Sequence, residues 1–275
     1  MITIGSKIQI IKSDIDAFVG QVGFVEGHAP DSDDQTIYKI RVGDMILPGW
    51  IRESEMVLMN RPYSTLIFDL DGCLTDSGIG IMRCAQYALE KFGINVPVLE
   101  RLRPFVGPPL EDSFKQFFGF SDEDAAKAVQ YYRERYFSRG KYEQHLYPEI
   151  PEFLKHLRKN GYRLAIATSK TINQTLEVLE WLGISKCFDN VAARDEQGIL
   201  HTKADVINSL LGSMGLNNSK RSCVMIGDRK YDIEGARQVG IDSIGVLWGY
   251  GDYEELKAAG ATHIVETLED LSKII

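Results

Sequence analysis

The chain has few cysteines and histidines and no long apolar run, and each shortage excludes a class of protein. Its four cysteines are widely separated: Cys73, Cys84, Cys187 and Cys223. This spacing is not that of a disulfide framework or a zinc site, and the five histidines show no ligand spacing either. No apolar run approaches the roughly 20 residues of a membrane-spanning helix, and no secretory signal pattern follows Met1. We therefore expect a cytoplasmic protein without a membrane partner.

Positive charge is also scarce. Lysine and arginine number 31 against 39 aspartates and glutamates, which gives a formal net charge of -8. Residues 1–60 alone hold five basic and nine acidic side chains. A protein whose main partner is the phosphate backbone of nucleic acid should be basic. We therefore expect no nucleic-acid partner, although a metal ion or a few lysines in a cleft could still attract a small anion.

The first 60 residues contain short β-like runs broken by glycine, aspartate and proline. The runs are SKIQII, VGQVGFVEG, TIYKIRV and EMVLM. This pattern predicts a small all-β barrel as an accessory domain. We expect the large side chain of Trp50 to close its small core, although an exposed aromatic side chain near a turn could instead anchor a partner.

From residue 61 onward, apolar runs alternate with stretches of helical periodicity, which is typical of a parallel sheet covered by helices. The predicted strands span residues 65–69, 163–168, 190–194, 222–228 and 243–248. The helices between them end at glycines: residues 151–160 before Gly161, 171–182 before Gly183 and 233–239 before Gly240. We predict an α/β fold with a Rossmann-like parallel sheet.

Residues 80–148 interrupt this alternation. They contain no convincing strand and are far too long for an ordinary crossover between two strands. Ser121 and Asp124 have the spacing of a helix capping box. We predict an inserted α-helical cap here, with residues 61–79 and 149–275 forming the α/β catalytic core.

Polar residues follow several of the predicted strands, where an open parallel sheet binds its ligands. They are Asp69 and Asp71, Thr168 and Ser169, Asp228 and Asp232, and Lys203, which opens a helix. A single aspartate in such a place is more often a turn residue or a helix cap. Clustered carboxylates, however, repel one another unless a cation binds or one of them stays protonated. Because carboxylate oxygens suit Mg²⁺, we predict a magnesium site at this edge.

The segments FDLDGCLTDS, AIATSK, HTKADVI and GDRKYD resemble, in this order, the four motifs of the haloacid dehalogenase superfamily. The resemblance covers roughly residues 64–275 and is in particular to the phosphoglycolate-phosphatase-like branch with a helical cap. Two positions depart from it: Cys73, where the family more often has threonine or valine, and Glu149, where glycine is commoner. The start of the chain resembles KOW-type small β-barrels over a short stretch.

The resemblance implies a reaction through an aspartyl phosphate. Asp69 would be the nucleophile that attacks phosphorus, and Asp71 would be the general acid and base. Asp228 would hold Mg²⁺ together with the side chain of Asp69 and the backbone carbonyl of Asp71. Asp232 would support the site as an outer ligand. The implied cofactor is therefore Mg²⁺.

The same resemblance implies a phosphate-binding set. Thr168 would donate a hydrogen bond to a phosphate oxygen, the Ser169 amide would assist, and Lys203 would neutralise charge on the transferring group. Arg103 in the cap is a candidate contact for a substrate anion, or simply an exposed arginine on a helical lobe.

Two classes of function follow. The first is a magnesium-dependent phosphatase of a small organic phosphate monoester, such as phosphoglycolate or a nucleoside monophosphate. A phosphotransferase of the phosphomutase kind would share its first step. The second class is a protein-binding module in which residues 1–60 are the working part on a phosphatase scaffold. For residues 1–60, the acidic balance favours a protein partner, a dimer contact or a wall beside the catalytic cleft.

Overall fold

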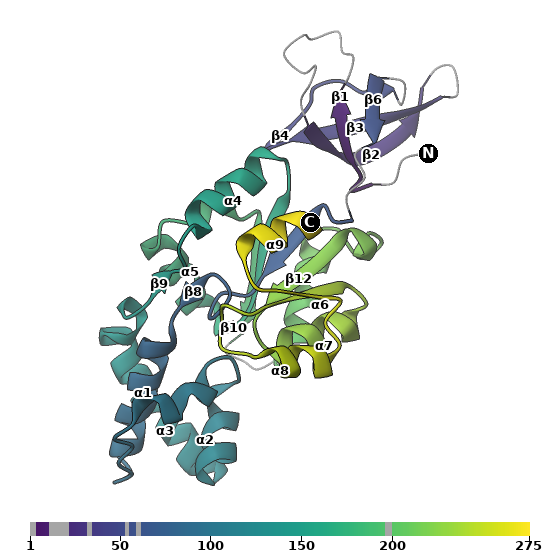
Figure 1. Cartoon of the computed structure of the whole chain (residues 1–275). Helices are drawn as coiled ribbons and strands as arrows, with labels where there is room; N and C mark the ends of the chain where they lie inside the picture. The colour runs from purple at the N-terminus through teal and green to yellow at the C-terminus, as the bar shows by residue number, and fades with distance from the viewer. Residues whose placement is uncertain (1–3, 11–21, 32–34, 53–54, 59–61, 196–199) are drawn as a thin grey trace.

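A parallel sheet of six strands forms the centre of the structure, a computed structural model that describes residues 4–10, 22–31, 35–52, 55–58, 62–195 and 200–275 (Figure 1). The strand order is β11-β10-β7-β12-β13-β14, and every neighbouring pair is parallel. The strands are β7 (Thr65–Phe68), β10 (Arg163–Thr171), β11 (Asn190–Arg194), β12 (Cys223–Gly227), β13 (Asp242–Val246) and β14 (His263–Val265). The predicted α/β fold is confirmed, and β14 is an additional strand at the edge of the sheet.

Helices cover both faces of this sheet. Leu66 and Phe68 of β7 belong to the apolar cluster that includes α4, α5 and α9, whereas Ile67 belongs to the cluster with α6 and α7. A strand that is buried on both faces needs a continuous apolar run, which explains the sequence TLIF. The helices are α4 (Ile150–Lys159), α5 (Ile172–Trp181), α6 (Lys203–Ser213), α7 (Lys230–Val239), α8 (Tyr253–Ala259) and α9 (Leu268–Ile274), with short 3-10 turns η5 (Ser185–Cys187) and η6 (Lys220–Ser222).

The inserted segment is helical and has an apolar core of its own. That core joins Phe105, Phe114 and Tyr132 with small residues of the first helix, such as Ala85. The predicted helix N-cap at Ser121 is present, because the Ser121 side chain accepts a hydrogen bond from the Asp124 amide at 3.1 Å. The elements are α1 (Gly78–Glu90), η3 (Leu99–Phe105), α2 (Leu110–Phe118), α3 (Asp122–Ser138) and η4 (Gly140–Tyr142).

The two connections between this cap and the core run side by side. β8 (Thr75–Asp76) pairs in antiparallel fashion with β9 (His145–Leu146). This short ribbon was not predicted, since two-residue strands leave no periodicity in the sequence. The two segments that connect the cap to the core are therefore hydrogen-bonded to each other.

The amino-terminal part forms an antiparallel sheet. Its order is β4-β3-β2-β1-β6, with β5 paired to β3. Within the described residues no pair joins β6 to β4 or β5, so the closed barrel stays a prediction. Trp50 is 48% exposed and Tyr38 is buried in the small core instead, so the expected role of Trp50 is wrong. The strands are β1 (Lys7–Ile10), β2 (Val22–Pro30), β3 (Thr36–Val42), β4 (Met45–Ile46), β5 (Ile51–Arg52) and β6 (Met56–Leu58).

This small sheet lies at the opposite end of the core from the cap helices (Figure 1). The rings of Phe24 and Tyr162 have centroids 6.0 Å apart, and the Arg41 guanidinium donates to the carbonyl of Gly161 at 3.5 Å. Gly161 and Tyr162 directly precede β10. The small sheet therefore packs on the amino-terminal ends of the core strands and is not a wall beside their carboxyl ends.

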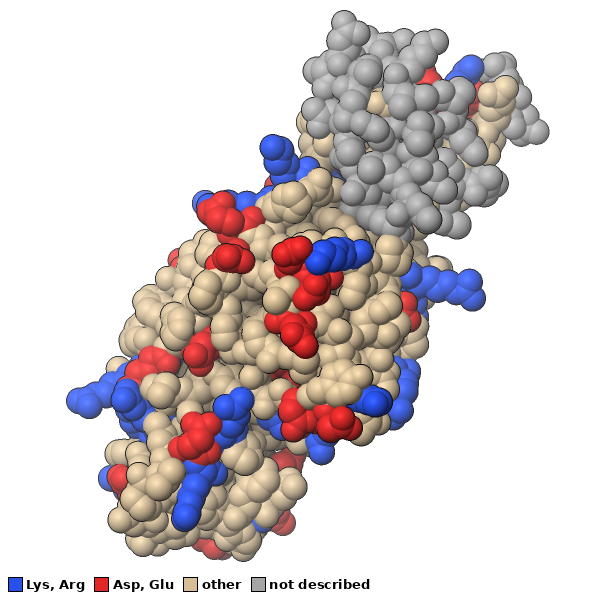
Figure 2. Space-filling view, in the orientation of Figure 1, with Lys and Arg blue, Asp and Glu red and all other residues tan. Residues whose placement is uncertain are grey.

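Charges of both signs are interspersed over the core and the cap. On the face shown in Figure 2, lysines and arginines lie among aspartates and glutamates rather than in one large basic area. None of the helices in the described part of the chain has the length and hydrophobicity of a membrane-spanning segment.

Candidate functional site

The sheet order reverses at β7, and this reversal places the candidate site. The chain continues from β7 to β10 and β11 on one side and later to β12, β13 and β14 on the other. In open α/β sheets the crevice at such a switch point, beyond the carboxyl ends of the strands, binds the ligand. Asp69 follows β7, Asp228 follows β12, and Thr168 lies near the end of β10. The topology therefore brings these three positions to one place.

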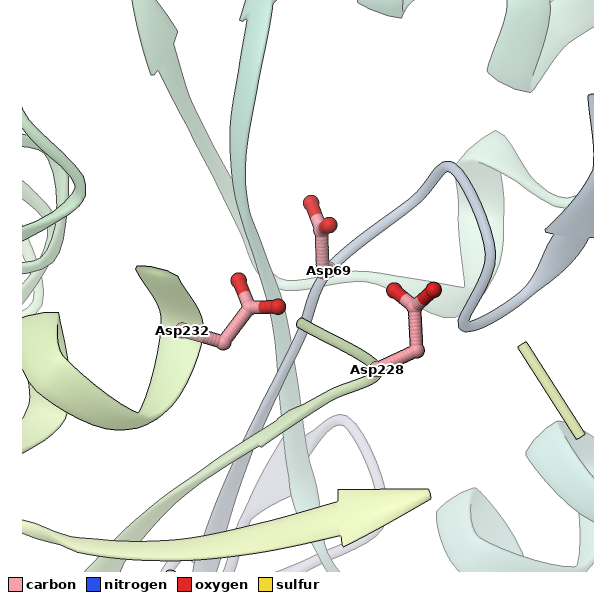
Figure 3. A group of neighbouring side chains, drawn as sticks. All are labelled: Asp69, Asp228 and Asp232. Carbon is pink, nitrogen blue, oxygen red and sulfur yellow. The ribbon is translucent and has the colours of Figure 1, made fainter. Parts of the chain in front are cut away.

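Three aspartates come together there. Asp69, Asp228 and Asp232 each offer a carboxylate oxygen, and these oxygens all lie within 4.8 Å of one another. In Figure 3 the side chains of Asp69 and Asp228 extend from the loops after their strands, while Asp232 extends from helix α7 toward the same space. All three residues are buried. The crowding that the sequence predicted for them is therefore present in the structure.

Glycines make this close approach possible. Gly72 has a φ of +88°, which side chains rarely adopt, and a Cβ atom there would overlap the carboxylate of Asp228. A Cβ at Gly227 would likewise overlap the side chain of Asp232. The glycines of FDLDG and IGD therefore leave room for the acids that stand near them in sequence or in space.

Lys203 holds two of the three acids. Its Nζ lies 2.9 Å from Asp69 Oδ1 and 2.7 Å from Asp232 Oδ1, and it donates a hydrogen bond to the carbonyl of Ala167 at 3.1 Å. The lysine side chain is only 4% exposed. A buried ammonium needs partners on every side, and here two carboxylates and a carbonyl supply them.

Burial and mutual repulsion change the acidity of these groups. Burial, with help from Asp232, raises the pKa of Asp69 to about 6, although Lys203 opposes this change. Burial and the carboxylates of Asp232 and Asp69 raise the pKa of Asp228 well above its ordinary value. Burial acts to lower the pKa of Lys203, but the two facing carboxylates outweigh it and keep the ammonium charged.

The residues present fit a magnesium ion. Asp228 Oδ2 accepts a hydrogen bond from the Tyr250 amide at 2.8 Å. Its Oδ1 atom is buried, and among the described residues it has no hydrogen-bond partner. A buried carboxylate oxygen without a partner is costly unless a cation takes that place. Asp69 and Asp228 could therefore hold the ion directly, with Asp232 behind them and already paired with Lys203.

A cavity of about 290 Å³ opens between the core and the cap beside Asp69. On the core side its lining includes Asp69, Asp71, Thr168 and Ser169. On the cap side it includes the aromatic side chains of Phe105, Tyr132 and Tyr136. The predicted nucleophile Asp69, the predicted acid Asp71, and Thr168 and Ser169 thus line one partly open cavity. Lys203 is not in this lining; it contacts Asp69 instead.

Arg103 lies elsewhere. It is absent from the lining of this cavity. Its guanidinium donates to the carbonyl of Gly249 at 3.4 Å and to Glu100 at 3.1 Å, and lies 5.4 Å from the centre of the Tyr250 ring. The structure therefore places Arg103 at an exposed contact between cap and core, which agrees with the alternative of an exposed arginine on a helical lobe.

Lys170 is a site residue that the sequence reasoning missed. Its Nζ lies 2.9 Å from Asp71 Oδ2 and donates a hydrogen bond to the Tyr136 hydroxyl at 3.1 Å. The residue stands in the segment AIATSK, directly after Ser169, so its position two residues beyond Thr168 was available as a signal. The contact with Tyr136 could not be read from the sequence, because Tyr136 lies in the cap, 34 positions away.

Comparison with known proteins identifies the family to which the chain belongs. Residues 66–246 match the family of haloacid dehalogenase-like hydrolases. The chain is 39% identical over 213 residues to a 5'-nucleotidase of Pseudomonas aeruginosa, a match that covers 78% of this chain and 96% of that protein. It is 34% identical over 212 residues to the tyrosine-protein kinase PtkA of Mycobacterium tuberculosis, covering 76% of this chain and 72% of PtkA.

Solved structures match over the same region. A crystal structure described as a predicted phosphatase from Clostridium acetobutylicum superposes with a TM-score of 0.74 at 40% identity. The match covers 77% of this chain and 97% of that one. The shared part thus leaves out a length close to that of the amino-terminal sheet.

Proposed function

Because the chain belongs to the haloacid dehalogenase-like hydrolases and is a phosphatase of that kind, we propose that it hydrolyses a small phosphate monoester with Mg²⁺ through an aspartyl phosphate on Asp69. The observation that carries this proposal is the convergence of Asp69, Asp71 and Thr168 on one cavity between core and cap. Such convergence supplies a nucleophile, a proton donor and a phosphate ligand within reach of one bound ester.

Asp69 supplies the nucleophile. One of its oxygens forms the new bond to phosphorus while the bond from phosphorus to the leaving oxygen breaks, and water then releases phosphate in a second displacement. Lys203 supports this role because it lies 2.9 Å from Asp69 Oδ1, where it holds the carboxylate in place and offsets the charge of an approaching phosphate.

Asp71 supplies the proton. It lines the same cavity as Asp69, so its carboxyl group can give a proton to the leaving oxygen in the first step and take one from water in the second. Thr168 is buried in the wall of that cavity. Its hydroxyl can donate to a phosphate oxygen, with the Ser169 amide beside it.

Mg²⁺ held by Asp69 and Asp228 would offset the negative charge of the phosphate group next to the nucleophile. Asp232 and Lys203 would then keep Asp69 oriented toward the cavity, as their contacts already do.

The walls of the cavity favour one kind of substrate. A two-carbon phosphate such as phosphoglycolate would leave much of about 290 Å³ empty and would not use the rings of Phe105, Tyr132 and Tyr136. A nucleoside 5'-monophosphate would place its base against aromatic side chains. The similarity to a 5'-nucleotidase supports the same choice. We therefore propose nucleoside 5'-monophosphates as the substrate class.

The test has two stages. Purified protein should release phosphate from p-nitrophenyl phosphate with Mg²⁺ and stop when a chelator is added, and Asp69→Asn should be inactive under the same conditions. Phosphate release is then compared between nucleoside 5'-monophosphates and 2-phosphoglycolate at equal concentrations. A higher kcat/KM for 2-phosphoglycolate would contradict the proposed substrate class. Transfer of the phosphoryl group to an added sugar, without release of phosphate, would instead indicate a phosphotransferase.

A further inference from the structure

Lys170 is a buried residue of the core that contacts both Asp71 in the core and Tyr136 in the cap. It lies at the end of β10, its side chain is 6% exposed, and its Nζ is 2.9 Å from Asp71 Oδ2. The other contacts come from the cap: the ammonium donates to the Tyr136 hydroxyl at 3.1 Å and lies 4.9 Å from the centre of the Tyr136 ring. Tyr136 belongs to helix α3. The surroundings of this ammonium are therefore complete only when the cap lies against the core.

The two oxygens of Asp71 are in different situations. Oδ2 is held by Lys170, whereas Oδ1 is buried and has no hydrogen-bond partner among the described residues. Asp71 also lines the cavity. A group that transfers protons must be held in position. Here Lys170 holds one oxygen of Asp71, and the other has no partner among the described residues that would compete for the proton.

We propose that Lys170 is a positioning residue that fixes the side chain of Asp71 for proton transfer when the cap is closed, with Tyr136 as its partner on the cap. This inference rests on the proposed function, because it assigns a role within the same reaction. It assigns Lys170 no contact with the phosphate group. Lys170 does line the cavity, so such a contact is the alternative that the two substrates separate.

The choice of leaving group separates this role from others. The p-nitrophenolate group departs readily without a proton, whereas an alkoxide such as the 5'-oxygen of a nucleoside needs one. Loss of a well-placed general acid should therefore slow an alkyl phosphate far more than p-nitrophenyl phosphate. The constant to compare is kcat/KM, because it covers the steps up to formation of the aspartyl phosphate.

Lys170→Met should lower kcat/KM for a nucleoside 5'-monophosphate by about 100-fold and for p-nitrophenyl phosphate by less than about fivefold, the range expected for loss of general acid catalysis. Asp71→Asn provides the benchmark and should show the same asymmetry. Tyr136→Phe keeps the ring and removes the hydroxyl, so it should show a smaller loss with the same asymmetry. Because phenylalanine keeps the ring that packs in the apolar core of the cap, Tyr136→Phe should fold as the wild type does.

The matched control is Lys141→Met. Lys141 also joins cap to core, with its Nζ 2.7 Å from Glu177 Oε2, but it does not line the cavity. Its removal should leave the ratio of the two kcat/KM values unchanged.

Three results decide the matter. Equal losses on both substrates in Lys170→Met would overturn the positioning role and favour a contact with the phosphate. An unchanged ratio in Tyr136→Phe would overturn the link to the cap. If the wild-type protein hydrolyses neither substrate with Mg²⁺, the proposed function itself fails. If the wild type is active but Lys170→Met loses kcat/KM equally on both substrates, only the role of Lys170 fails.

Discussion

Replacing Asp228 by asparagine should make the metal-free protein more stable and remove its response to Mg²⁺. Asp228 is fully buried, and burial together with Asp232 and Asp69 raises its pKa well above the ordinary value. Asparagine has nearly the same shape and no charge. Its carbonyl oxygen can still accept the hydrogen bond from the Tyr250 amide, so the substitution relieves repulsion without opening a cavity.

The size of the effect follows from proton linkage. The folded state keeps a proton on Asp228 that the unfolded chain releases above its ordinary pKa of 3.8, so stability falls as the pH rises. The loss is about 1.4 kcal/mol per pH unit while the folded carboxyl stays protonated. Asparagine binds no proton, so the advantage of Asp228→Asn should be larger at pH 7.5 than at pH 5.5, by about 1.4 kcal/mol for each pH unit over which the folded carboxyl stays protonated.

The assay is denaturant unfolding with a chelator present, at both pH values, for wild type, Asp228→Asn and a control. Asp232→Asn is the control, because Asp232 is a buried partner of Lys203 at 2.7 Å and its loss should destabilise the protein by about 3 kcal/mol or more. Added Mg²⁺ should stabilise the wild type and leave Asp228→Asn unchanged. Parallel pH profiles for the wild type and Asp228→Asn, or a less stable Asp228→Asn, would refute the reasoning.

Three further predictions concern single residues. Asp69→Asn should abolish turnover and leave the circular dichroism spectrum unchanged; clear residual turnover would contradict the nucleophile assignment. Lys203→Met should lower kcat/KM about 100-fold or more, the usual loss for one electrostatic contact in the transition state. Glu149 is exposed and has a φ of 68°, so Glu149→Gly should raise the free energy of unfolding by about 0.5 kcal/mol. Glu152→Gly, within α4, should instead lower it by about 1 kcal/mol.

Glu149 also explains one departure seen in the sequence. The resemblance predicts glycine at this position, and the structure gives a physical reason: the backbone at Glu149 is left-handed, with φ 68° and ψ -13° at the start of α4. The sequence shows that Glu149 departs from the glycine of the resemblance. Only the structure shows the positive φ that makes glycine suitable there.

Sequence periodicity predicted the parallel sheet well, because strands buried on both faces require continuous apolar runs. It missed β14, which is only three residues long, and the two-residue pair of β8 and β9. Such short strands are set by the hydrogen-bond register with their neighbours rather than by a pattern of their own.

The residue types at the ends of the strands, by themselves, determined that acids, a hydroxyl and a lysine would meet at one edge, since parallel strands bring their carboxyl ends together. Only the tertiary structure decided which of these groups touch. Lys170 meets Tyr136 across 34 positions of sequence, and Arg103 turns to Gly249 instead of the cavity. Both outcomes depend on where the cap packs against the core, and that packing arises from contacts between distant segments that no local pattern encodes.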